Sequence, residues 1–284
     1  MSRIVYVNGE FLPEEDAKIS VFDRGFLMAD GVYEVTSVLE GKLCDYEGHK
    51  IRLARSLSEL KMESPVTDDE LLDIHRELVT RNELHEGVVY LQITRGAADR
   101  DFAWPKDAKP GIVLFTQDKD LEEAKAAKTG IKVVSQPDLR WARRDIKTVQ
   151  LLYPSFAKMA AKEQGADDAW MVADDGFVTE GTSNNAYIVK GGKIITRHLT
   201  NDILHGITRA AVLKLAREAQ MQVEERPFTI AEAQEADEAF ITAASTFVCP
   251  VVSVDGVALG SGEPGPVAQR LREIYISEAR AHAI

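Results

Sequence analysis

The spacing of the apolar residues changes along the chain, and this change most limits what the chain can fold into. Residues 31–46 alternate between apolar and polar at every second position, which is typical of strands with one buried face. Residues 49–60 and 68–82 instead repeat with the period of an amphipathic helix. Strand patterns return at residues 87–96 and 111–117. The first part of the chain is therefore predicted to form a sheet with two helices.

Turn and cap residues separate these segments. Asn8-Gly9 lies between two short apolar runs, a strong signal for a β-hairpin, and Glu40-Gly41 marks a second turn. Thr67 or Asp68 stands just before the second helical segment, where an oxygen acceptor caps the first backbone N–H groups. These residues predict where the elements begin and end.

The second half of the chain again mixes strand and helix patterns, with Gly191-Gly192 and Asp255-Gly256 as hairpin turns. Strands are expected at residues 131–136, 168–174, 177–181, 185–196 and 238–244, and helices at residues 154–165, 207–221 and 267–281. The elements do not follow a steady β-α-β order, and no G-x-G-x-x-G sequence follows a strand, which speaks against a dinucleotide site.

A charged segment at residues 118–130 separates the two halves, and we take it as an interdomain linker. Residues 1–117 then form a small N-terminal α/β domain, and residues 131–284 form a larger C-terminal domain. The overall fold class predicted for the chain is α+β with two domains.

Composition excludes several classes of function. A net charge of -12 argues against binding to nucleic acid. Cys44 and Cys249 lie far apart without a C-x-x-C pair, so we expect buried core cysteines rather than a disulfide framework or a zinc site. The six histidines show no paired ligand spacing, and no metal is expected. No apolar run approaches the length of a membrane span, and no secretory pattern is present, so a cytoplasmic protein is expected.

Lys147 is the first candidate for chemistry. It follows Asp145-Ile146 and precedes an apolar run, and Arg140, Arg143 and Arg144 lie nearby in sequence. Burial and neighbouring cations both favour the neutral amine, which is a nucleophile toward carbonyl groups. A Schiff-base lysine fits this pattern, but a solvated basic loop explains the same residues.

Two further segments suit an anionic cofactor with a ring nitrogen. Glu180 ends an apolar strand, where a carboxylate can keep a pyridine nitrogen protonated. Gly206-Ile207-Thr208 stands at the start of a helix, where backbone N–H groups and the helix dipole attract a phosphate, with the Thr208 hydroxyl as an extra donor. A turn with an exposed glutamate and a helix start capped by Thr208 are the alternatives.

Arginines in the first half complete the set of candidates. Arg52 lies on the first helix one turn from His49, where it can contact a phosphate or simply face solvent. Arg95 and Arg100 share a loop with Phe102 and Trp104. Arginine beside aromatic residues suits a carboxylate substrate with an apolar side chain, and ordinary surface residues of a loop would look the same.

These motifs occur in an order that resembles the fold-type IV pyridoxal-phosphate (PLP) enzymes, most closely the D-amino-acid aminotransferases. The resemblance covers nearly the whole chain. It rests on "DRGFLMADGVYEV", "GHKIRL", "RRDIKTVQLL", "VTEGTSNNAYIV", "LHGITR" and "EAFITAAS". It implies PLP as cofactor, a transaminase activity, and a C-terminal domain that binds the cofactor.

The resemblance also implies roles for single residues. Lys147 would form the Schiff base with PLP, as an internal aldimine, and would later move the proton between the substrate α-carbon and C4′. Glu180 would contact the pyridine nitrogen. Arg52, Ile207 and Thr208 would hold the phosphate, the last two mainly through backbone N–H groups.

The remaining implied positions differ in part from the family pattern. Ala243 and Ala244 stand where relatives carry hydroxyl residues, so backbone N–H contacts to the phosphate are expected there. Tyr33 would line the substrate pocket. The family's R-x-H carboxylate trap, donated by the neighbouring subunit, corresponds to Arg100 and Phe102, so its histidine is replaced. Losing that donor costs roughly 1.5–3 kcal/mol of carboxylate binding.

The function implied is a ping-pong transaminase that moves the amino group of D-alanine-like donors to 2-oxoglutarate or pyruvate. An (R)-selective primary-amine transaminase, a branched-chain L-amino-acid aminotransferase and an aminodeoxychorismate lyase are alternatives with the same cofactor. A binding protein that kept the fold without catalysis is a further class, disfavoured by Lys147 and Glu180. Because the carboxylate trap comes from a partner, a homodimer with the active site at the subunit interface is expected.

Overall fold

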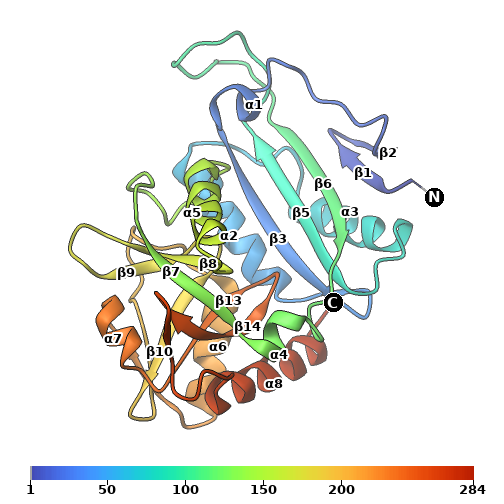
Figure 1. The fold of residues 1–284 in the computed structure, drawn as a ribbon. Helices are drawn as coiled ribbons and strands as arrows, with labels where there is room; N and C mark the ends of the chain where they lie inside the picture. The colour runs from blue at the N-terminus through green and yellow to red at the C-terminus, as the bar shows by residue number, and fades with distance from the viewer. Residues whose placement is uncertain (1) are drawn as a thin grey trace. The chain divides into compact units, whose positions relative to one another are not determined.

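The structure is a computed structural model that describes residues 2–284, and the contacts divide the chain into two units. Unit 1 comprises Met1–Asp120, Ile146–Gln150 and His282–Ile284. Unit 2 comprises Leu121–Asp145 and Leu151–Ala281. Figure 1 labels most of the helices and strands of both.

This grouping differs from a simple cut of the sequence in two places, one of which is the C-terminal His282–Ile284, which groups with unit 1. Ile146–Gln150, which the sequence places in the C-terminal domain, groups with unit 1. The expected linker at 118–130 contains the last residue of a strand and a short helix, α4, at Lys125–Thr129. Separate folding of domains 1–117 and 131–284 stays a prediction.

Unit 1 is built on an antiparallel sheet of six strands in the order β2-β1-β6-β5-β3-β4. Its strands are β1 (Ile4–Val7), β2 (Glu10–Pro13), β3 (Gly31–Leu39), β4 (Lys42–Leu43), β5 (Gly87–Thr94) and β6 (Gly111–Asp118). Its helices are α1 (Arg24–Met28), α2 (Tyr46–Glu59) and α3 (Asp68–Arg81). The predicted hairpin at Asn8-Gly9 is confirmed, as is the Thr67 cap of α3, which forms a capping box with Glu70.

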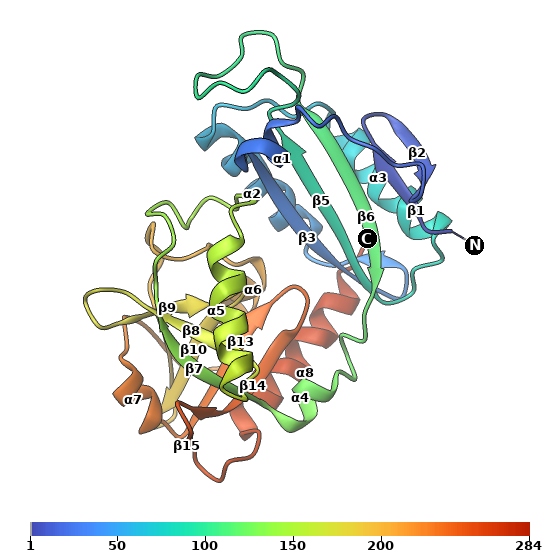
Figure 2. The ribbon, with the colours of Figure 1, turned by 45° about the horizontal axis from the view of Figure 1, so that its top comes forward.

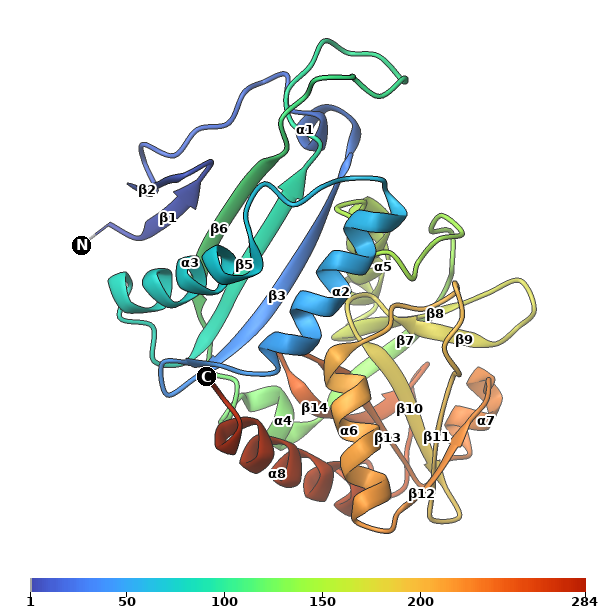
Figure 3. The same ribbon diagram turned by 180° about the vertical axis from the view of Figure 1, so that it is seen from behind.

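Helices α2 and α3 cover one face of this sheet, as Figure 3 shows. Because side chains alternate along a strand, Val32, Glu34 and Val38 of β3 lie on one face and Tyr33 on the other. Val32 and Val38 belong to the apolar core, together with Leu53 of α2. Glu34 is thus a carboxylate placed on the buried face.

Unit 2 contains a mixed sheet of nine strands, in which β12-β11-β10-β13-β14-β7-β8-β9 is the path and β15 pairs with β14. The strands are β7 (Ile131–Pro137), β8 (Asp168–Val172), β9 (Val178–Gly181), β10 (Asn185–Lys190), β11 (Lys193–Thr196), β12 (Gln222–Glu225), β13 (Glu238–Ala243), β14 (Phe247–Val254) and β15 (Val257–Ala258). Besides α4, the helices are α5 (Leu152–Glu163), α6 (Ile207–Glu218), α7 (Ile230–Gln234) and α8 (Pro266–Ala281).

Helices cover both faces of the unit 2 sheet. Helix α8 packs on β13 and β14, α6 on β13, and α5 on β7 and β8. Figure 3 shows α6 and α8 on the near side of the sheet with α5 behind it. The α+β class predicted from the sequence is confirmed, and Cys44 and Cys249 are buried in separate units, as expected.

Candidate active site

Lys147 lies in a short extended segment that runs beside the start of β3. The backbone N–H of Tyr33 donates to the Lys147 carbonyl over 3.0 Å, and the N–H of Val149 donates to the Gly31 carbonyl over 3.1 Å. The Lys147 N–H donates to the hydroxyl of Ser56 on α2 over 3.4 Å. Ile146 is buried in the core of unit 1. The lysine backbone is therefore fixed to the sheet, and its side chain is partly exposed.

The Lys147 side chain extends over the ring of Tyr33, with Nζ 4.0 Å from the ring centroid. Tyr33 stacks on Tyr90 of β5, which stacks on Phe115 of β6, at centroid distances of 5.7 and 4.7 Å. Burial raises the pKa of Tyr90 to about 12, so this phenol stays neutral. The Lys147 side chain therefore packs on a row of three stacked aromatic rings, on the face of the sheet opposite Glu34.

Arg52 is buried on α2 and pairs with Glu34. Arg52 Nε donates to Glu34 Oε1 over 2.8 Å and Nη2 donates to Oε2 over 2.7 Å, while His49 Nδ1 lies 2.7 Å from Oε2. Burial by itself raises the pKa of Glu34, but the charge and hydrogen bonds of Arg52, aided by His49, overcome burial and lower the pKa to about 2. The guanidinium is therefore held in one plane by an ionised carboxylate.

Arg100 and Phe102 lie on the loop between β5 and β6, and both are exposed. The Arg100 guanidinium lies 5.5 Å from the centroid of the Phe102 ring, and 79% of the Phe102 surface is exposed. Arg95, in contrast, is buried at the end of β5 and pairs with Asp30. Of the two arginines suggested by the sequence, Arg100 is the one presented to solvent.

In unit 2, Glu180 at the end of β9 is almost completely buried and accepts three hydrogen bonds. The donors are Arg140 Nη1 at 2.5 Å to Oε1, and Asn185 Nδ2 and the Leu204 N–H, each at 3.0 Å to Oε2. Arg140 is in turn bound by Asp138 through Nε and Nη2. Glu180 is therefore a positioned buried carboxylate, not the exposed turn residue of the alternative hypothesis.

Opposing effects set the charge of this carboxyl group. Burial raises the pKa of Glu180, and the Asp138 carboxylate adds to the rise, while Arg140 and the Leu204 N–H limit it. A protonated ring nitrogen near Glu180 would further favour the carboxylate. The site is thus suited to a cationic partner.

The start of α6 lies next to Glu180 in unit 2. Gly206 occupies the cap position and has no side chain to cap the helix, and Thr208 is a buried residue inside the first turn. Thr208 is therefore not the cap. A Cβ atom at Gly206 would lie 2.1 Å from Asn185 Oδ1, so the glycine allows Asn185 to reach both Glu180 and the Leu204 carbonyl. The first N–H groups of this helix need an acceptor from elsewhere.

Ala243 and Ala244 lie at the tight turn between β13 and β14, where the Thr246 N–H donates to the Ala243 carbonyl over 3.2 Å. The Thr246 hydroxyl is buried and makes no hydrogen bond within residues 2–284. This hydroxyl comes three positions after Ala243, so the turn retains one unsatisfied polar group.

The three arginines that crowd Lys147 in sequence each have a carboxylate partner in unit 2. Arg140 binds Asp138 and Glu180, Arg144 contacts Asp138 and Asp202, and Arg143 binds Asp145. These acidic partners balance much of the positive charge. The expectation that Lys147 is surrounded by uncompensated cations is therefore wrong for these three arginines.

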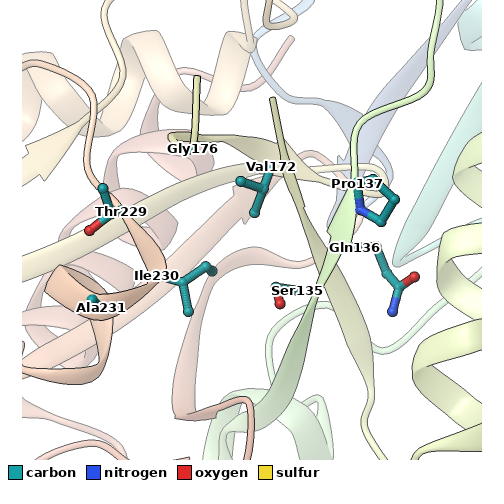
Figure 4. Close-up of a pocket in the computed structure, with 8 residues that line it drawn as sticks. All are labelled: Ser135, Gln136, Pro137, Val172, Gly176, Thr229, Ile230 and Ala231. Carbon is teal, nitrogen blue, oxygen red and sulfur yellow. The ribbon is translucent and has the colours of Figure 1, made fainter. Parts of the chain in front are cut away.

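A separate pocket of unit 2 lies beside β7 and α7 and is shown in Figure 4. It is lined by Ser135, Gln136, Pro137, Val172, Gly176, Thr229, Ile230 and Ala231. Its lining has no charged side chain to hold a phosphate and no lysine. Across the described part of the chain, no three His, Cys, Asp or Glu side chains gather as metal ligands would. None of the helices described there has the length and apolar character of a membrane span.

Comparison with known proteins bears on this set of groups. A model of the amino-transferase class IV family matches residues 31–254. The D-alanine aminotransferase of Staphylococcus aureus (strain MSSA476) is 36% identical over 281 residues, 99% of each chain. That of Bacillus licheniformis is 37% identical over 268 residues, 94% of each chain.

Solved structures agree on the fold. The T.th. branched-chain amino acid aminotransferase complexed with N-(5'-phosphopyridoxyl)-L-glutamate has a TM-score of 0.90 at 27% identity, covering 99% of this chain and 95% of that one. The same enzyme with pyridoxamine 5'-phosphate gives 0.91 at 26%, with the same coverage. The chain therefore belongs to the amino-transferase class IV family. It is a PLP-dependent aminotransferase of fold type IV.

The groups described above fit this cofactor. An amine over an aromatic ring suits an aldehyde, and the buried Glu180 suits a ring nitrogen. Arg52 and the uncapped start of α6 suit a phosphate, and the buried Thr246 hydroxyl offers a further donor. The sequence missed Glu34, His49 and Asn185. Of these three residues, only Glu34 could have been noticed in the sequence, because it is a charged residue at a position of an apolar strand whose side chain is expected to face the core.

Proposed function

We propose that the protein is a D-amino-acid transaminase that moves the amino group of D-alanine-like donors to 2-oxoglutarate or pyruvate. The observation that carries the proposal is the identity to D-alanine aminotransferases over 99% of the chain. The T.th. branched-chain enzyme is less similar in sequence, at 26–27% identity in the two structures cited above. Tyr33, whose ring lies against Lys147, supports the D-specific assignment.

Each residue has a defined task in this reaction. PLP, when bound, supplies the electron sink for the substrate α-carbon. Lys147 attaches the cofactor through its amine and, once displaced by substrate, carries the proton from and to that carbon. Glu180 keeps the pyridine nitrogen protonated, and Arg140 opposes the rise in the Glu180 pKa that burial causes.

The phosphate is assigned to groups that donate hydrogen bonds. Arg52 supplies a guanidinium held by Glu34, and Ile207 and Thr208 supply backbone N–H groups at the start of α6. Ala243 or Ala244 adds a backbone N–H from the turn. Backbone N–H groups and one fixed arginine are together sufficient to bind a phosphate strongly, so no further lysine or arginine side chain is required.

Arg100 is assigned to the substrate carboxylate. Arg100 is exposed in unit 1 of its own subunit. In the proposed homodimer, a second subunit would cover the loop that carries Arg100, and Arg100 would there contact the substrate. Unit 1 exposes four apolar residues that are close together in sequence, Ile19, Val21, Phe22 and Phe26, which supports such an interface. Size-exclusion chromatography with light scattering tests it, and an active monomer would contradict it.

Phe102 supports a second candidate, an (R)-selective primary-amine transaminase. Its exposed ring replaces a hydrogen-bond donor of the carboxylate trap and favours apolar groups at that place. Carboxylate substrates then lose about one to two decades of affinity relative to a trap with both donors.

One experiment separates these functions. The yellow PLP form of the protein is mixed with D-alanine, L-leucine or (R)-1-phenylethylamine, and the visible absorption band is followed. We expect D-alanine to bleach this band fastest, with growth of the near-ultraviolet band of the pyridoxamine form and release of pyruvate. Bleaching by L-leucine alone would overturn the D-specific proposal, and bleaching by the amine as fast as by D-alanine would favour the second candidate.

A further inference from the structure

The loop between β5 and β6, residues 96–110, has to hold Arg100 in place although most of its side chains are exposed. Figure 2 shows this loop extending past the ends of the two strands. An exposed loop without buried side chains of its own is mobile unless other groups fix its backbone. The fixing groups therefore decide how well Arg100 can meet a carboxylate.

Arg24 supplies the principal attachment. Its side chain is only 3% exposed, and Nη1 donates to the Asp101 carbonyl over 2.6 Å, with the Ala103 carbonyl at 3.5 Å. These two carbonyls lie on either side of Phe102, and the first belongs to the residue directly after Arg100. A single buried guanidinium therefore holds the part of the loop that carries both candidate substrate contacts.

Asp30 orients this arginine and connects it to a second attachment. Asp30 Oδ2 accepts from Arg24 Nε over 2.7 Å and from Arg95 Nε over 2.8 Å. The Arg95 guanidinium lies 4.2 Å from the centroid of Trp104, the next aromatic residue of the loop, and donates to the Leu60 carbonyl over 2.9 Å. One carboxylate thus fixes two arginines that hold the loop at two places.

The N-terminal end of the loop is fixed through backbone groups to the segment around α1. The Arg24 N–H donates to the Gly96 carbonyl over 2.9 Å, and the Ala98 N–H donates to the Phe22 carbonyl over 3.1 Å. A Cβ atom at Gly96 would lie 1.9 Å from the Lys109 carbonyl, so this glycine lets the two ends of the loop meet. The ends are closed by backbone, whereas the tip depends on Arg24 and Arg95.

The same cluster is continuous with the lysine segment of unit 1. Asp30 directly precedes Gly31 of β3, whose carbonyl accepts from Val149, two residues after Lys147. Loss of the Arg24 side chain would release the loop tip, because Arg24 donates to the Asp101 carbonyl. The lysine segment would stay in place, because it is held by backbone hydrogen bonds to β3 that do not involve Arg24. The loss of Arg24 should affect substrate binding more than cofactor attachment.

We propose that Arg24 is a positioning residue for substrate recognition, which fixes the 96–110 loop so that Arg100 can bind the substrate carboxylate. The proposal rests on the assignment of Arg100 in the proposed function. Arg24 does not touch substrate, and its effect passes through the Asp101 and Ala103 carbonyls. The loop is held in addition by Asp30, which orients Arg24 and Arg95, and by Trp104, which packs on Arg95.

The test compares the PLP-loaded variants Arg24→Met, Arg24→Lys, Trp104→Ala and Arg100→Met with an exposed-arginine control, Arg81→Met. The rate at which D-alanine bleaches the visible band is measured at increasing D-alanine concentration. This gives the saturation constant for D-alanine and the maximal bleaching rate. We expect the saturation constant to rise about tenfold or more in Arg24→Met and Arg100→Met, and about threefold in Trp104→Ala, with maximal rates within about twofold. Arg24→Lys keeps the charge but cannot span Asp30 and both carbonyls, so its effect should be intermediate.

A second readout reports on the loop itself. Trypsin cleavage after Arg100, followed by mass spectrometry without substrate, should be faster in Arg24→Met than in the parent protein and unchanged in Arg81→Met. If Arg24→Met does not retain PLP, Trp104→Ala, which alters an exposed side chain, carries the test with the same two readouts.

The outcomes separate this inference from the proposed function. If Arg100→Met leaves the D-alanine constant unchanged, or D-alanine does not bleach the parent protein, the substrate assignment fails, and the trypsin rate then tests the loop attachment alone. If Arg100→Met raises the constant while Arg24→Met and Trp104→Ala change neither the constant nor the cleavage rate, the positioning role of Arg24 is wrong.

Discussion

Glu34 on β3 holds Arg52 on α2 by two parallel hydrogen bonds, 2.8 Å from Nε and 2.7 Å from Nη2. This geometry ties the helix that carries a phosphate-binding candidate to the strand that carries Tyr33 on its other face. A bidentate pair of this kind fixes both the position and the plane of the guanidinium. The orientation of Arg52 is therefore set before any anion arrives.

Replacement of Glu34 by Gln should weaken PLP binding. The variant keeps one acceptor but loses the charge, so Arg52 is left buried beside a neutral amide and its orientation is no longer fixed. We expect the PLP dissociation constant to rise about tenfold, measured by the visible band during dialysis. The control is Glu47→Gln on the same helix, where an exposed pair with Lys50 contributes little. Equal effects of the two variants would refute the role of Glu34.

The same pair predicts how stability depends on pH. The folded-state pKa of Glu34, about 2, lies below the ordinary value of 4.5, so its contribution is complete above about pH 5 and is lost as the pH falls toward 2. The shift corresponds to about 3 kcal/mol at pH 7. Urea unfolding of the parent protein and Glu34→Gln should show this difference at pH 7, and about half of it near pH 3. A difference that is independent of pH would mean that Glu34 is not ionised by its partners.

Replacement of Arg140 by Gln should act on the charge of Glu180. Burial already raises the pKa of Glu180, and Arg140 is the main group that limits the rise, so its removal raises the pKa further. A neutral Glu180 cannot keep a pyridine nitrogen protonated. PLP binding should weaken at least tenfold, and more at pH 6 than at pH 8.5, because Glu180 is protonated more at low pH. Arg143→Gln, which leaves Glu180 untouched, is the matched control.

The sequence predicted the elements of the fold where local signals are strong. The Asn8-Gly9 hairpin, the Thr67 cap and helix α6 all follow from spacing or from a turn residue. Strand β12 was missed because "QVEE" is polar and forms only by pairing with β11, in which each partner residue lies 29 positions earlier. Helix α1 was missed because five residues are too few to show a helical period.

The site was predictable to a similar degree. Lys147, Glu180 and Arg52 stand in motifs, so a resemblance could identify them, and their roles stay proposals. Their partners depend on tertiary packing. Nothing in the sequence says that Glu34 meets Arg52 across a strand and a helix. Nor does "TSNNAY" show that Asn185 is the asparagine that reaches Glu180, since its neighbour Asn184 binds Asp168 instead.

Gly206 and Asn185 provide the last prediction, a double-mutant cycle. Gly206→Ala places a Cβ atom 2.1 Å from Asn185 Oδ1, which must displace the amide from Glu180 and the Leu204 carbonyl. Asn185→Ala removes the same amide and opens the space for the new methyl group. Each single variant should weaken PLP binding about tenfold, by loss of a hydrogen bond to the Glu180 carboxylate.

The double variant should bind PLP about as well as Asn185→Ala alone, because the amide is then absent and the remaining close neighbour of the methyl group is the Arg209 Cβ atom at 3.2 Å, which only a small shift has to relieve. The measurement is the PLP dissociation constant of all four proteins, with the free energy of unfolding determined in parallel so that a general loss of stability is recognised. Additive effects, near a hundredfold in the double variant, would show that Gly206 acts on the helix start itself and not through Asn185. Non-additivity would instead establish that Asn185 transmits the conformation of the α6 start to the carboxylate proposed to hold the pyridine nitrogen.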